Sequence, residues 1–411
     1  MSTGELHALV IFRIEYCPGM LIMASILSII TILLFVIYAA LLVYYHYGWR
    51  SIPYFVAPID DAPATKITVI VPARNEAENI SACVQSILAQ DYPSPLFEIL
   101  VVDDHSTDET AEIVASFSQY NVHCLDLKDF VTDPINSYKK KAIEVAVARA
   151  AGELIVTTDA DCIVPTDWLR TIGAFYGKYR PSFMAAPVSI DNGHRFIERF
   201  QALDFMTLQG ITGASVYKKL HRMCNGANLA YEKSAFEAVG GFRGIEKIAS
   251  GDDMLLMHKI YTLDPQRVMF LKSTAAIVRT RPVNSWKAFF NQRIRWASKA
   301  DKYDDKSILP VLITVYCFNV LMLLLPAIGI FDDTVFTVFH FNFSVIDYWI
   351  FLIVLKTMIE LFFLYPVSVF FQRQPLLRWF PLMQPFHIVY TVIAGWLGKF
   401  GTYQWKDRRV H

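Results

Sequence analysis

An uncharged apolar run near the N-terminus constrains this chain more than any other feature of its sequence. Residues 20–45 contain no Asp, Glu, Lys, Arg or His. A helix of about 20 apolar residues crosses the hydrocarbon core of a bilayer, so this run is long enough to span a membrane. It is also longer than the apolar part of a signal peptide, which leaves a cleaved signal as the minor alternative. We predict a transmembrane helix over residues 20–46.

More apolar runs follow residue 306. Residues 308–331 and 345–371 are predicted to form two further transmembrane helices. The second of these carries Lys356 and Glu360, which lie one helical turn apart and can pair inside a membrane. The last run, residues 382–398, is short and contains Pro385. We predict that it crosses the membrane, re-enters it or lies in the interface.

Charged residues between the apolar runs predict the orientation of the chain. Residues 281–306 hold seven basic and three acidic residues, whereas residues 331–347 hold three Asp and neither Lys nor Arg. Basic loops remain on the cytoplasmic side. We therefore expect a multi-pass protein of the cell membrane, with residues 60–280 as a cytoplasmic domain and residues 281–306 as an amphipathic interfacial helix. A crossing at residues 382–398 would be the exception, because it would export four basic residues.

Composition excludes several classes of protein. The formal net charge is zero, so no general positive field attracts nucleic acid, and we predict no nucleic-acid partner. The six cysteines include no C-x-x-C pair and are too few for a disulfide scaffold. We expect reduced thiols, as in cytosolic proteins.

Between the membrane segments, strand-like and helix-like patterns alternate. Strands are predicted at Ile67–Val71, Ile99–Val102, Val122–Leu127 and Leu154–Thr157, with helical spacing of apolar residues between them. This alternation predicts an α/β domain with a mostly parallel sheet and helices on both faces. The sequence contains neither G-x-G-x-x-G after the first strand nor G-x-x-x-x-G-K-[ST], which excludes a dinucleotide fingerprint and a P-loop.

Polar residues cluster where three of these strands end. The clusters are Pro72-Ala73-Arg74-Asn75-Glu76, Asp103-Asp104 and Asp159-Ala160-Asp161. Turns favour Asp and Asn in any case, which accounts for one cluster but poorly for three in succession. Ligands bind at the carboxyl ends of parallel strands, and Mg²⁺ or Mn²⁺ takes carboxylate oxygens together with substrate phosphates. The Asp159 and Asp161 pair is therefore a candidate metal site.

Two later motifs are ambiguous when taken alone. Gly251-Asp252-Asp253 precedes an apolar helical pattern, where Asp commonly caps a helix, so Asp252 can cap while Asp253 faces the site. Gln292-Arg293-Ile294-Arg295-Trp296 lies on an amphipathic stretch before the second apolar run, where Arg and Trp are common at the membrane interface. Arg295 can bind a diphosphate through two parallel hydrogen bonds, and Trp296 can stack on a sugar.

Taken in order, these motifs resemble the family 2 glycosyltransferases, the inverting membrane group that includes cellulose, chitin, hyaluronan and ceramide-glucosyl synthases. The resemblance covers Ile67 to Trp296 and extends to Gly226-Ala227-Asn228 and Gly240-Gly241-Phe242. It implies a GT-A fold, a Rossmann-like arrangement flanked here by transmembrane helices. Two positions depart from the family pattern: Asp252 stands where Glu is usual, and His105 where Gly is common, which leaves the base preference open.

The resemblance also implies roles for individual residues. Pro72, Arg74 and Glu76 would line the nucleotide, and Asp103 or Asp104 would hold the uracil or ribose. Asp161 with Asp159 would bind Mg²⁺ or Mn²⁺, and Asp253 would be the catalytic base. Gln292, Arg295 and Trp296 would form the Q-x-x-R-W site.

The function that this resemblance implies is inverting transfer of a sugar from a nucleotide-sugar, expected to be a UDP-sugar, to a lipid or lipid-linked glycan at the membrane. Three alternatives stay open at this point. One is a processive polysaccharide synthase, although three or four membrane segments are few for a polymer channel. The others are a nucleotidyl- or phosphotransferase that uses the same carboxylates, and a non-catalytic membrane partner.

Overall fold

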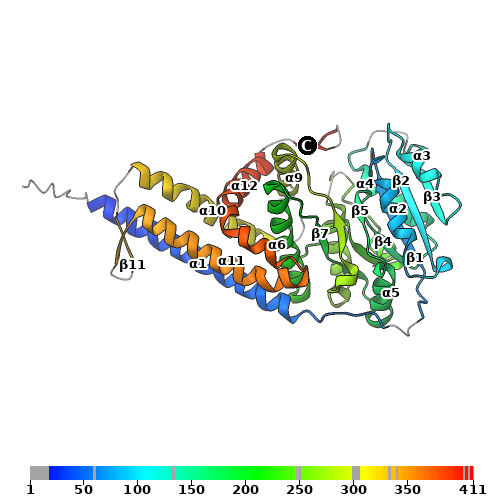
Figure 1. Cartoon of the computed structure of the whole chain (residues 1–411), viewed down its shortest axis with the longest axis horizontal. Helices are drawn as coiled ribbons and strands as arrows, with labels where there is room; N and C mark the ends of the chain where they lie inside the picture. The colour runs from blue at the N-terminus through cyan, green and yellow to red at the C-terminus, as the bar shows by residue number, and fades with distance from the viewer. Residues whose placement is uncertain are drawn as a thin grey trace, which may run out of the picture.

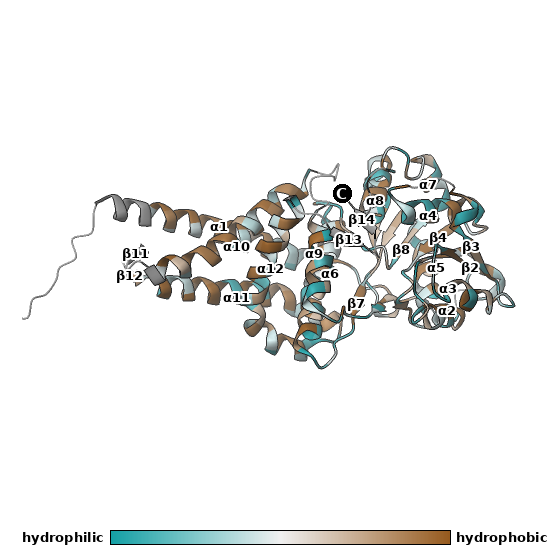
Figure 2. Ribbon diagram, turned by 90° about the horizontal axis from the view of Figure 1, so that it is seen from above, coloured by the Kyte–Doolittle hydropathy of each residue, from teal (hydrophilic) through white to brown (hydrophobic). Residues whose placement is uncertain are grey.

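The computed structural model places a sheet domain at one end of the molecule and a group of long helices at the other (Figure 1). It describes residues 18–58, 62–131, 135–246, 248, 251–298, 306–331, 335–338, 341–400, 403–405 and 408–410. Figure 2 shows apolar residues concentrated along the long helices and polar residues over the sheet domain. The two parts share buried residues, since one apolar cluster contains Ile70 of the sheet together with Trp49 and Val367 of the long helices.

The sheet domain is built on seven strands in the order β3-β2-β1-β4-β8-β6-β9. Their bounds are β1 (Ile67–Ala73), β2 (Phe97–Asp103), β3 (Val122–Asp126), β4 (Leu154–Thr157), β6 (Phe183–Ala185), β8 (Leu229–Glu232) and β9 (Val268–Phe270). The first four are parallel, and β8 runs antiparallel to β4 and β6. The predicted mostly parallel sheet is therefore confirmed, and each predicted strand lies within two residues of its observed bounds.

Apolar residues alternate between the two faces of this sheet. Val69 and Val71 of β1 belong to one buried cluster and Ile70 to another, as the two-residue period of a strand requires. The helices of the domain are α2 (Ile80–Leu88), α3 (Thr110–Ala115), α4 (Tyr138–Arg149), α5 (Trp168–Tyr179), α7 (Lys233–Ala238) and α8 (Asp252–Leu263). A smaller sheet contains β5 (Cys162–Ile163), β10 (Val278–Thr280) and β7 (Val188–Ile190) in that order.

Within the described residues, three helices are long and apolar enough to cross a membrane: α1 (Pro18–Ser51), α10 (Ile308–Phe331) and α11 (Val345–Phe370). α1 is longer at both ends than the segment 20–46 predicted from the sequence. Its last two turns are not lipid-facing throughout, because Tyr45 is buried against Phe363 of α11 and Trp49 against Phe270 of β9. The hairpin β11 (Val335–Val338) and β12 (Phe341–Ser344) joins α10 to α11.

Three more helices lie where the long helices meet the sheet domain (Figure 1). They are α6 (Phe196–Lys218), α9 (Trp286–Ala297) and α12 (Phe380–Phe400). α12 packs against α9, α10 and α6, and it is not among the helices that meet the criteria for a membrane span. α9 occupies only the middle of the predicted interfacial segment 281–306, of which residues 299–305 lie outside the described residues. Strands β13 (Tyr403–Trp405) and β14 (Arg408–Val410) form a short C-terminal hairpin.

Candidate active site

The loops after β1 and β2 hold one another at the carboxyl edge of the sheet. The Arg74 Nη1 atom donates hydrogen bonds to the carbonyl oxygens of Asp104 (2.8 Å) and His105 (3.2 Å). Asn75 and His105 both adopt positive φ, which few residues other than Gly do, and the loops are locked by Ser106 Oγ accepting from the Asn75 N–H. This arrangement turns Asp104 toward the cavity described below.

The neighbouring Asp103 has a different position. Its side chain is buried and its Oδ2 atom accepts a hydrogen bond from the Ser106 N–H at 3.2 Å, so it supports the loop. Pro72, Arg74, Glu76 and Asp104 line the cavity, whereas Asp103 does not. Of the two aspartates that the sequence left as alternatives for nucleotide binding, Asp104 is the one with access.

Asp159 and Asp161 follow β4, and a lysine from α4 lies beside them. The Lys139 Nζ atom is 2.7 Å from Asp159 Oδ1 and 3.8 Å from Asp252 Oδ2. Burial by itself lowers the pKa of Lys139, but the carboxylates of Asp159 and Asp252 raise it by more, so its net pKa lies above the usual value. Asp161 Oδ2 accepts from Thr280 Oγ1 of β10 at 3.3 Å.

These two aspartates supply oxygen ligands of the kind that Mg²⁺ and Mn²⁺ bind. Among the described residues, no group of three His, Cys, Asp or Glu side chains forms a complete ligand set. Such a set is not required, because divalent ions at phosphate sites often take one or two carboxylates and complete their shell with phosphate oxygens and water. Lys139 is ion-paired with Asp159, so this carboxylate already faces a positive charge.

Asp253 lies in the first turn of α8, two residues after Gly251. Gly251 is the N-cap residue and has a φ of 76°, a conformation that favours glycine. The capping role considered for Asp252 is therefore wrong, and Asp252 is instead largely buried near Lys139. The Asp253 Oδ2 atom accepts from the Gly226 N–H at 3.0 Å, which fixes the carboxylate beside the loop that leads into β8.

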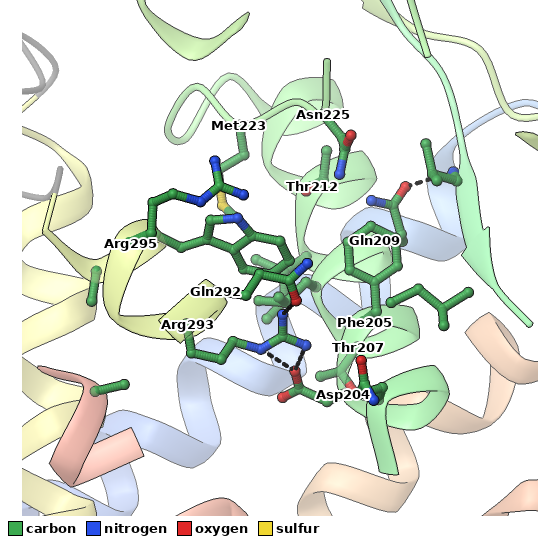
Figure 3. A pocket seen from close by; sticks show the side chains of 18 of the residues that line it. Asp204, Phe205, Thr207, Gln209, Thr212, Met223, Asn225, Gln292, Arg293 and Arg295 are labelled. Carbon is green, nitrogen blue, oxygen red and sulfur yellow. Dashed lines mark hydrogen bonds and ion pairs between the residues drawn. The ribbon is translucent and has the colours of Figure 1, made fainter. Parts of the chain in front are cut away.

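α9 brings the Q-x-x-R-W residues to the same cavity (Figure 3). Arg295 extends from α9 toward Met223, while Gln292 accepts a hydrogen bond from Arg293 Nη1 at 2.9 Å. The Trp296 ring packs at 6.1 Å from the Phe205 ring, measured between centroids, and 4.2 Å from the Arg293 guanidinium carbon. Gln292 and Trp296 are thus held in place by the residue between them in the motif.

One cavity of about 1390 Å³ joins all of these groups. We call the part lined by Glu76, Asp104, Asp159, Asp161 and Asp253 its sheet end. The part between the long helices and α12, lined by Glu360, Gln384, His387 and Tyr390, is its helix end. Apolar side chains of α1 and α10 also line the cavity, among them Leu41, Leu42, Val311, Leu312 and Val315.

The sequence did not predict several cavity residues, among them Lys139, Asp204 and Arg293, and Gln384, His387 and Tyr390 at the helix end. Arg293 Nη2 lies 2.6 Å from Asp204 Oδ2 of α6, and both side chains are 4% exposed. No local pattern marks this pair, because the two residues are far apart in sequence and α6 is apolar on most sides. Lys139 lies in the first turn of α4, and only the position of this helix before β4, which leads into Asp159, could have indicated it.

The sequence matches a family model over this domain. Residues 68–240 match the model described as glycosyl transferase family 2. These residues therefore form a glycosyl transferase family 2 domain. The resemblance drawn from the motifs is thereby confirmed, while Asp253 and the Q-x-x-R-W residues lie beyond the matched residues, so their roles remain proposals.

Relatives of known name support this family 2 assignment. The chain is 28% identical over 262 residues to a probable glycosyltransferase, YdaM, of Bacillus subtilis (60% of this chain, 58% of that protein). It is 27% identical over 256 residues to the beta-monoglucosyldiacylglycerol synthase of Synechocystis (60% of this chain, 50% of that protein). The matched part of the chain thus spans about half the length of these relatives.

A solved structure shares the fold. The mannosyltransferase PcManGT of Pyrobaculum calidifontis, in complex with GDP-Man and Mn²⁺, superposes with a TM-score of 0.59 at 20% identity. The match covers 90% of this chain and 99% of that one. The GT-A fold expected from the resemblance is confirmed, together with three flanking helices long enough to cross a membrane.

Proposed function

We propose that this protein transfers a sugar, with inversion, from a nucleotide-sugar to a lipid or lipid-linked sugar at the cytoplasmic face of the cell membrane. The observation that carries the proposal is that a single cavity has carboxylates of the sheet edge at one end and apolar side chains of α1 and α10 along its walls. A polar donor and an amphiphilic acceptor can therefore meet inside it. The Synechocystis relative is named as a beta-monoglucosyldiacylglycerol synthase, and a glucosyldiacylglycerol is a glycosylated lipid, which agrees with this acceptor class.

A UDP-sugar is the first donor to test, with GDP-sugars as the next, because PcManGT was solved with GDP-Man. Arg74 and Asp104 are proposed to face the base and ribose. Glu76, Asp159, Asp161, Asp252 and Asp253 all line the sheet end, so a diphosphate there would be repelled unless a cation stood between. Asp159 and Asp161 are proposed to hold Mg²⁺ or Mn²⁺, which supplies charge neutralisation for the leaving diphosphate when bound.

Asp253 is proposed to act as general base. It takes the proton of the acceptor hydroxyl while that oxygen forms a bond to the anomeric carbon and the bond from that carbon to the phosphate oxygen breaks. Attack from the opposite face inverts the centre, and the electron pair leaves on the nucleoside diphosphate. Arg295 is proposed to bind the diphosphate and Trp296 to pack against the sugar.

The experiment is a panel of nucleotide-sugars incubated with the purified protein, Mn²⁺ and a native lipid extract, followed by mass spectrometry. We expect one added sugar on a lipid and release of nucleoside diphosphate. Released pyrophosphate would instead indicate a nucleotidyltransferase, and a ladder of products would indicate a processive synthase.

Metal dependence is tested in the same assay. Excess EDTA should abolish transfer, and Mg²⁺ or Mn²⁺ should restore it. Isothermal titration of Mn²⁺ with the nucleotide present should show weaker ion binding to Asp161→Asn than to the parent protein. Full activity of Asp161→Asn in excess EDTA would exclude the proposed metal site.

The proposed orientation is tested by thiol labelling of intact cells. A cysteine at Thr337, in β11, should react with an impermeant reagent, and a cysteine at the exposed Tyr120 of the sheet domain should not. Labelling is compared with that of the parent protein, which contains native cysteines. The reverse pattern would place the sheet domain outside the cell, away from cytosolic nucleotide-sugars.

A further inference from the structure

The helix end of the cavity has a polar wall made by one helix. Gln384, His387 and Tyr390 follow one another at three-residue steps along α12, which places them on one side of the helix, and all three line the cavity. The His387 Nδ1 atom is buried and makes no hydrogen bond with the described part of the chain. A ring nitrogen of this kind can donate to or accept from a polar group of a ligand.

Each charged group behind this wall has an opposite charge in contact. Lys356 Nζ lies 2.5 Å from Glu360 Oε1 on α11, and Gln384 and Tyr38 hydrogen-bond to the same carboxylate. Arg293 and Asp204 form the second ion pair behind the wall, and the Tyr390 hydroxyl donates a hydrogen bond to Asp204. Lys356 is fully buried. The wall is therefore polar, yet its two cations and two anions cancel.

This balance selects the kind of ligand that fits. An extra negative charge, such as a lipid phosphate, would lie beside carboxylates already paired with their cations, and a buried charge without its own partner is strongly disfavoured. Uncharged groups can instead use the hydrogen-bonding capacity that is left on α12. His387 Nδ1 has no partner among the described residues, and Gln384, which already accepts from Lys356 and donates to Glu360, keeps a second amide N–H. Tyr390 donates to Asp204, so its oxygen can accept from a hydroxyl or amide. The apolar residues of α1 and α10 that line the cavity match hydrocarbon chains.

We propose that the acceptor is an uncharged lipid with a free hydroxyl, whose ester or amide groups lie against Gln384, His387 and Tyr390 while the hydroxyl reaches Asp253. This assignment rests on the proposed glycosyl transfer and narrows its acceptor. It selects an uncharged lipid over the phosphate-containing lipid carriers that the broader proposal allows.

The test compares acceptors with the same acyl chains whose headgroups differ, one uncharged and one carrying a phosphate. Full-length protein in nanodiscs receives its donor with either diacylglycerol or phosphatidylglycerol of the same acyl chains, each of which has a free hydroxyl, and polyprenyl phosphate serves as a third acceptor. We expect kcat/KM for diacylglycerol to exceed that for phosphatidylglycerol by about tenfold or more, the effect of one unfavourable buried interaction. Equal or better use of either charged lipid overturns the inference.

Two variants test the wall itself. His387→Phe should raise KM for diacylglycerol about tenfold and leave the donor KM unchanged, with partial recovery in His387→Gln. Val389→Leu, at an exposed position of α12 that does not line the cavity, is the control and should behave as the parent protein. An unchanged acceptor KM in His387→Phe contradicts the assignment.

Glu360→Gln tests the charge balance directly, since it leaves Lys356 without its carboxylate. Relative use of phosphatidylglycerol should rise in this variant and return to the parent value in the double variant Lys356→Met with Glu360→Gln. An unchanged preference in a folded Glu360→Gln protein counts against the inference. If polyprenyl phosphate or a lipid-linked sugar is glycosylated and diacylglycerol is not, this inference fails and the proposed function stands. If the donor is never consumed, the proposed function itself fails.

Discussion

The two ends of the cavity differ in how their charges are balanced. At the sheet end, carboxylates from the ends of β1, β2 and β4 and from α8 outnumber the lysine that lies among them. At the helix end, each buried charge has an opposite charge within hydrogen-bond distance. An acidic surface attracts a metal and, through it, a diphosphate, whereas a balanced surface in an apolar setting suits an uncharged ligand. This difference is why we propose the sheet end as the donor site and the helix end as the acceptor site.

The largest expected effect lies at the sheet end, at Asp253. Asp253→Asn should lower kcat by about 10²–10⁴, the usual contribution of a positioned general base. Donor binding should survive, because the proposed nucleotide and metal contacts come from other residues. Both quantities are measured on purified protein, turnover by product formation and nucleotide affinity by calorimetry.

Asp252→Asn, at the neighbouring position, is the matched control for Asp253→Asn. This variant should lower kcat by less than Asp253→Asn does, because Asp252 is largely buried near Lys139 and its proposed contribution is electrostatic. Both substitutions preserve side-chain shape, so the contrast controls for damage to folding. A normal turnover in Asp253→Asn, or a dead Asp252→Asn beside an active Asp253→Asn, would mean that the base has been assigned to the wrong residue.

At the helix end the main effect should be on stability. Arg293→Met leaves the Asp204 carboxylate without its cation, and removal of one member of a buried pair costs about 3–5 kcal/mol. Adding Asp204→Asn removes the orphaned charge and should recover much of that loss. Thermal unfolding in detergent measures both variants, with Arg243→Met at an exposed position as control. A single variant as stable as the parent would show that the pair does not hold α9 to α6.

A smaller effect should separate the two adjacent aspartates after β2. Asp104→Asn should weaken nucleotide binding by about tenfold, since it removes one charge-assisted hydrogen bond, and should leave kcat at saturating donor nearly unchanged. Asp103→Asn should affect nucleotide binding less, because Asp103 does not line the cavity and accepts a hydrogen bond from the Ser106 N–H. Calorimetric titration of the nucleotide gives both affinities. The opposite order would assign the nucleotide contact to Asp103.

The sheet end could be predicted from sequence because its residues follow strands in short, ordered motifs. Asp104, Asp159 and Asp161 each lie just past a buried apolar run, and the carboxyl ends of parallel strands meet at one edge. The helix end could not be predicted in the same way. Asp204 and Arg293 meet only because α6 and α9 pack together, and the sequence separation of these helices gives no local signal. The contact of Lys356 with Glu360 was predictable, because both lie on one helix.

Boundaries were predicted least well where packing overrides local pattern. Residues after Tyr45 include His46 and Arg50, which end the uncharged run, yet α1 continues to Ser51 because Tyr45 and Trp49 are buried between α6, α11 and the sheet domain. The capping role considered for Asp252 failed because Gly251 takes the left-handed conformation that starts α8 one residue earlier.

Lys272 lies at the junction between the sheet domain and the C-terminal end of α1. Its Nζ atom donates to the Trp49 carbonyl oxygen at 2.7 Å and lies 4.4 Å from the Trp49 ring centroid, so the lysine joins the sheet domain to the end of α1. Burial lowers the pKa of Lys272 from its usual value of 10.5 to about 8. Between pH 8 and 10.5 the folded state therefore binds fewer protons at this group than the unfolded state does.

From this group alone, the free energy of unfolding should rise with pH across that window. Lys272→Met lacks this contribution, so the melting temperature of the parent minus that of the variant should increase from pH 7.5 to pH 10. The difference isolates Lys272 from the other groups that titrate in this range. Lys287→Met, at an exposed position, controls for the loss of one amine. A difference that stays flat or decreases with pH would show that Lys272 is not desolvated against Trp49 and that the junction is more open than the structure indicates.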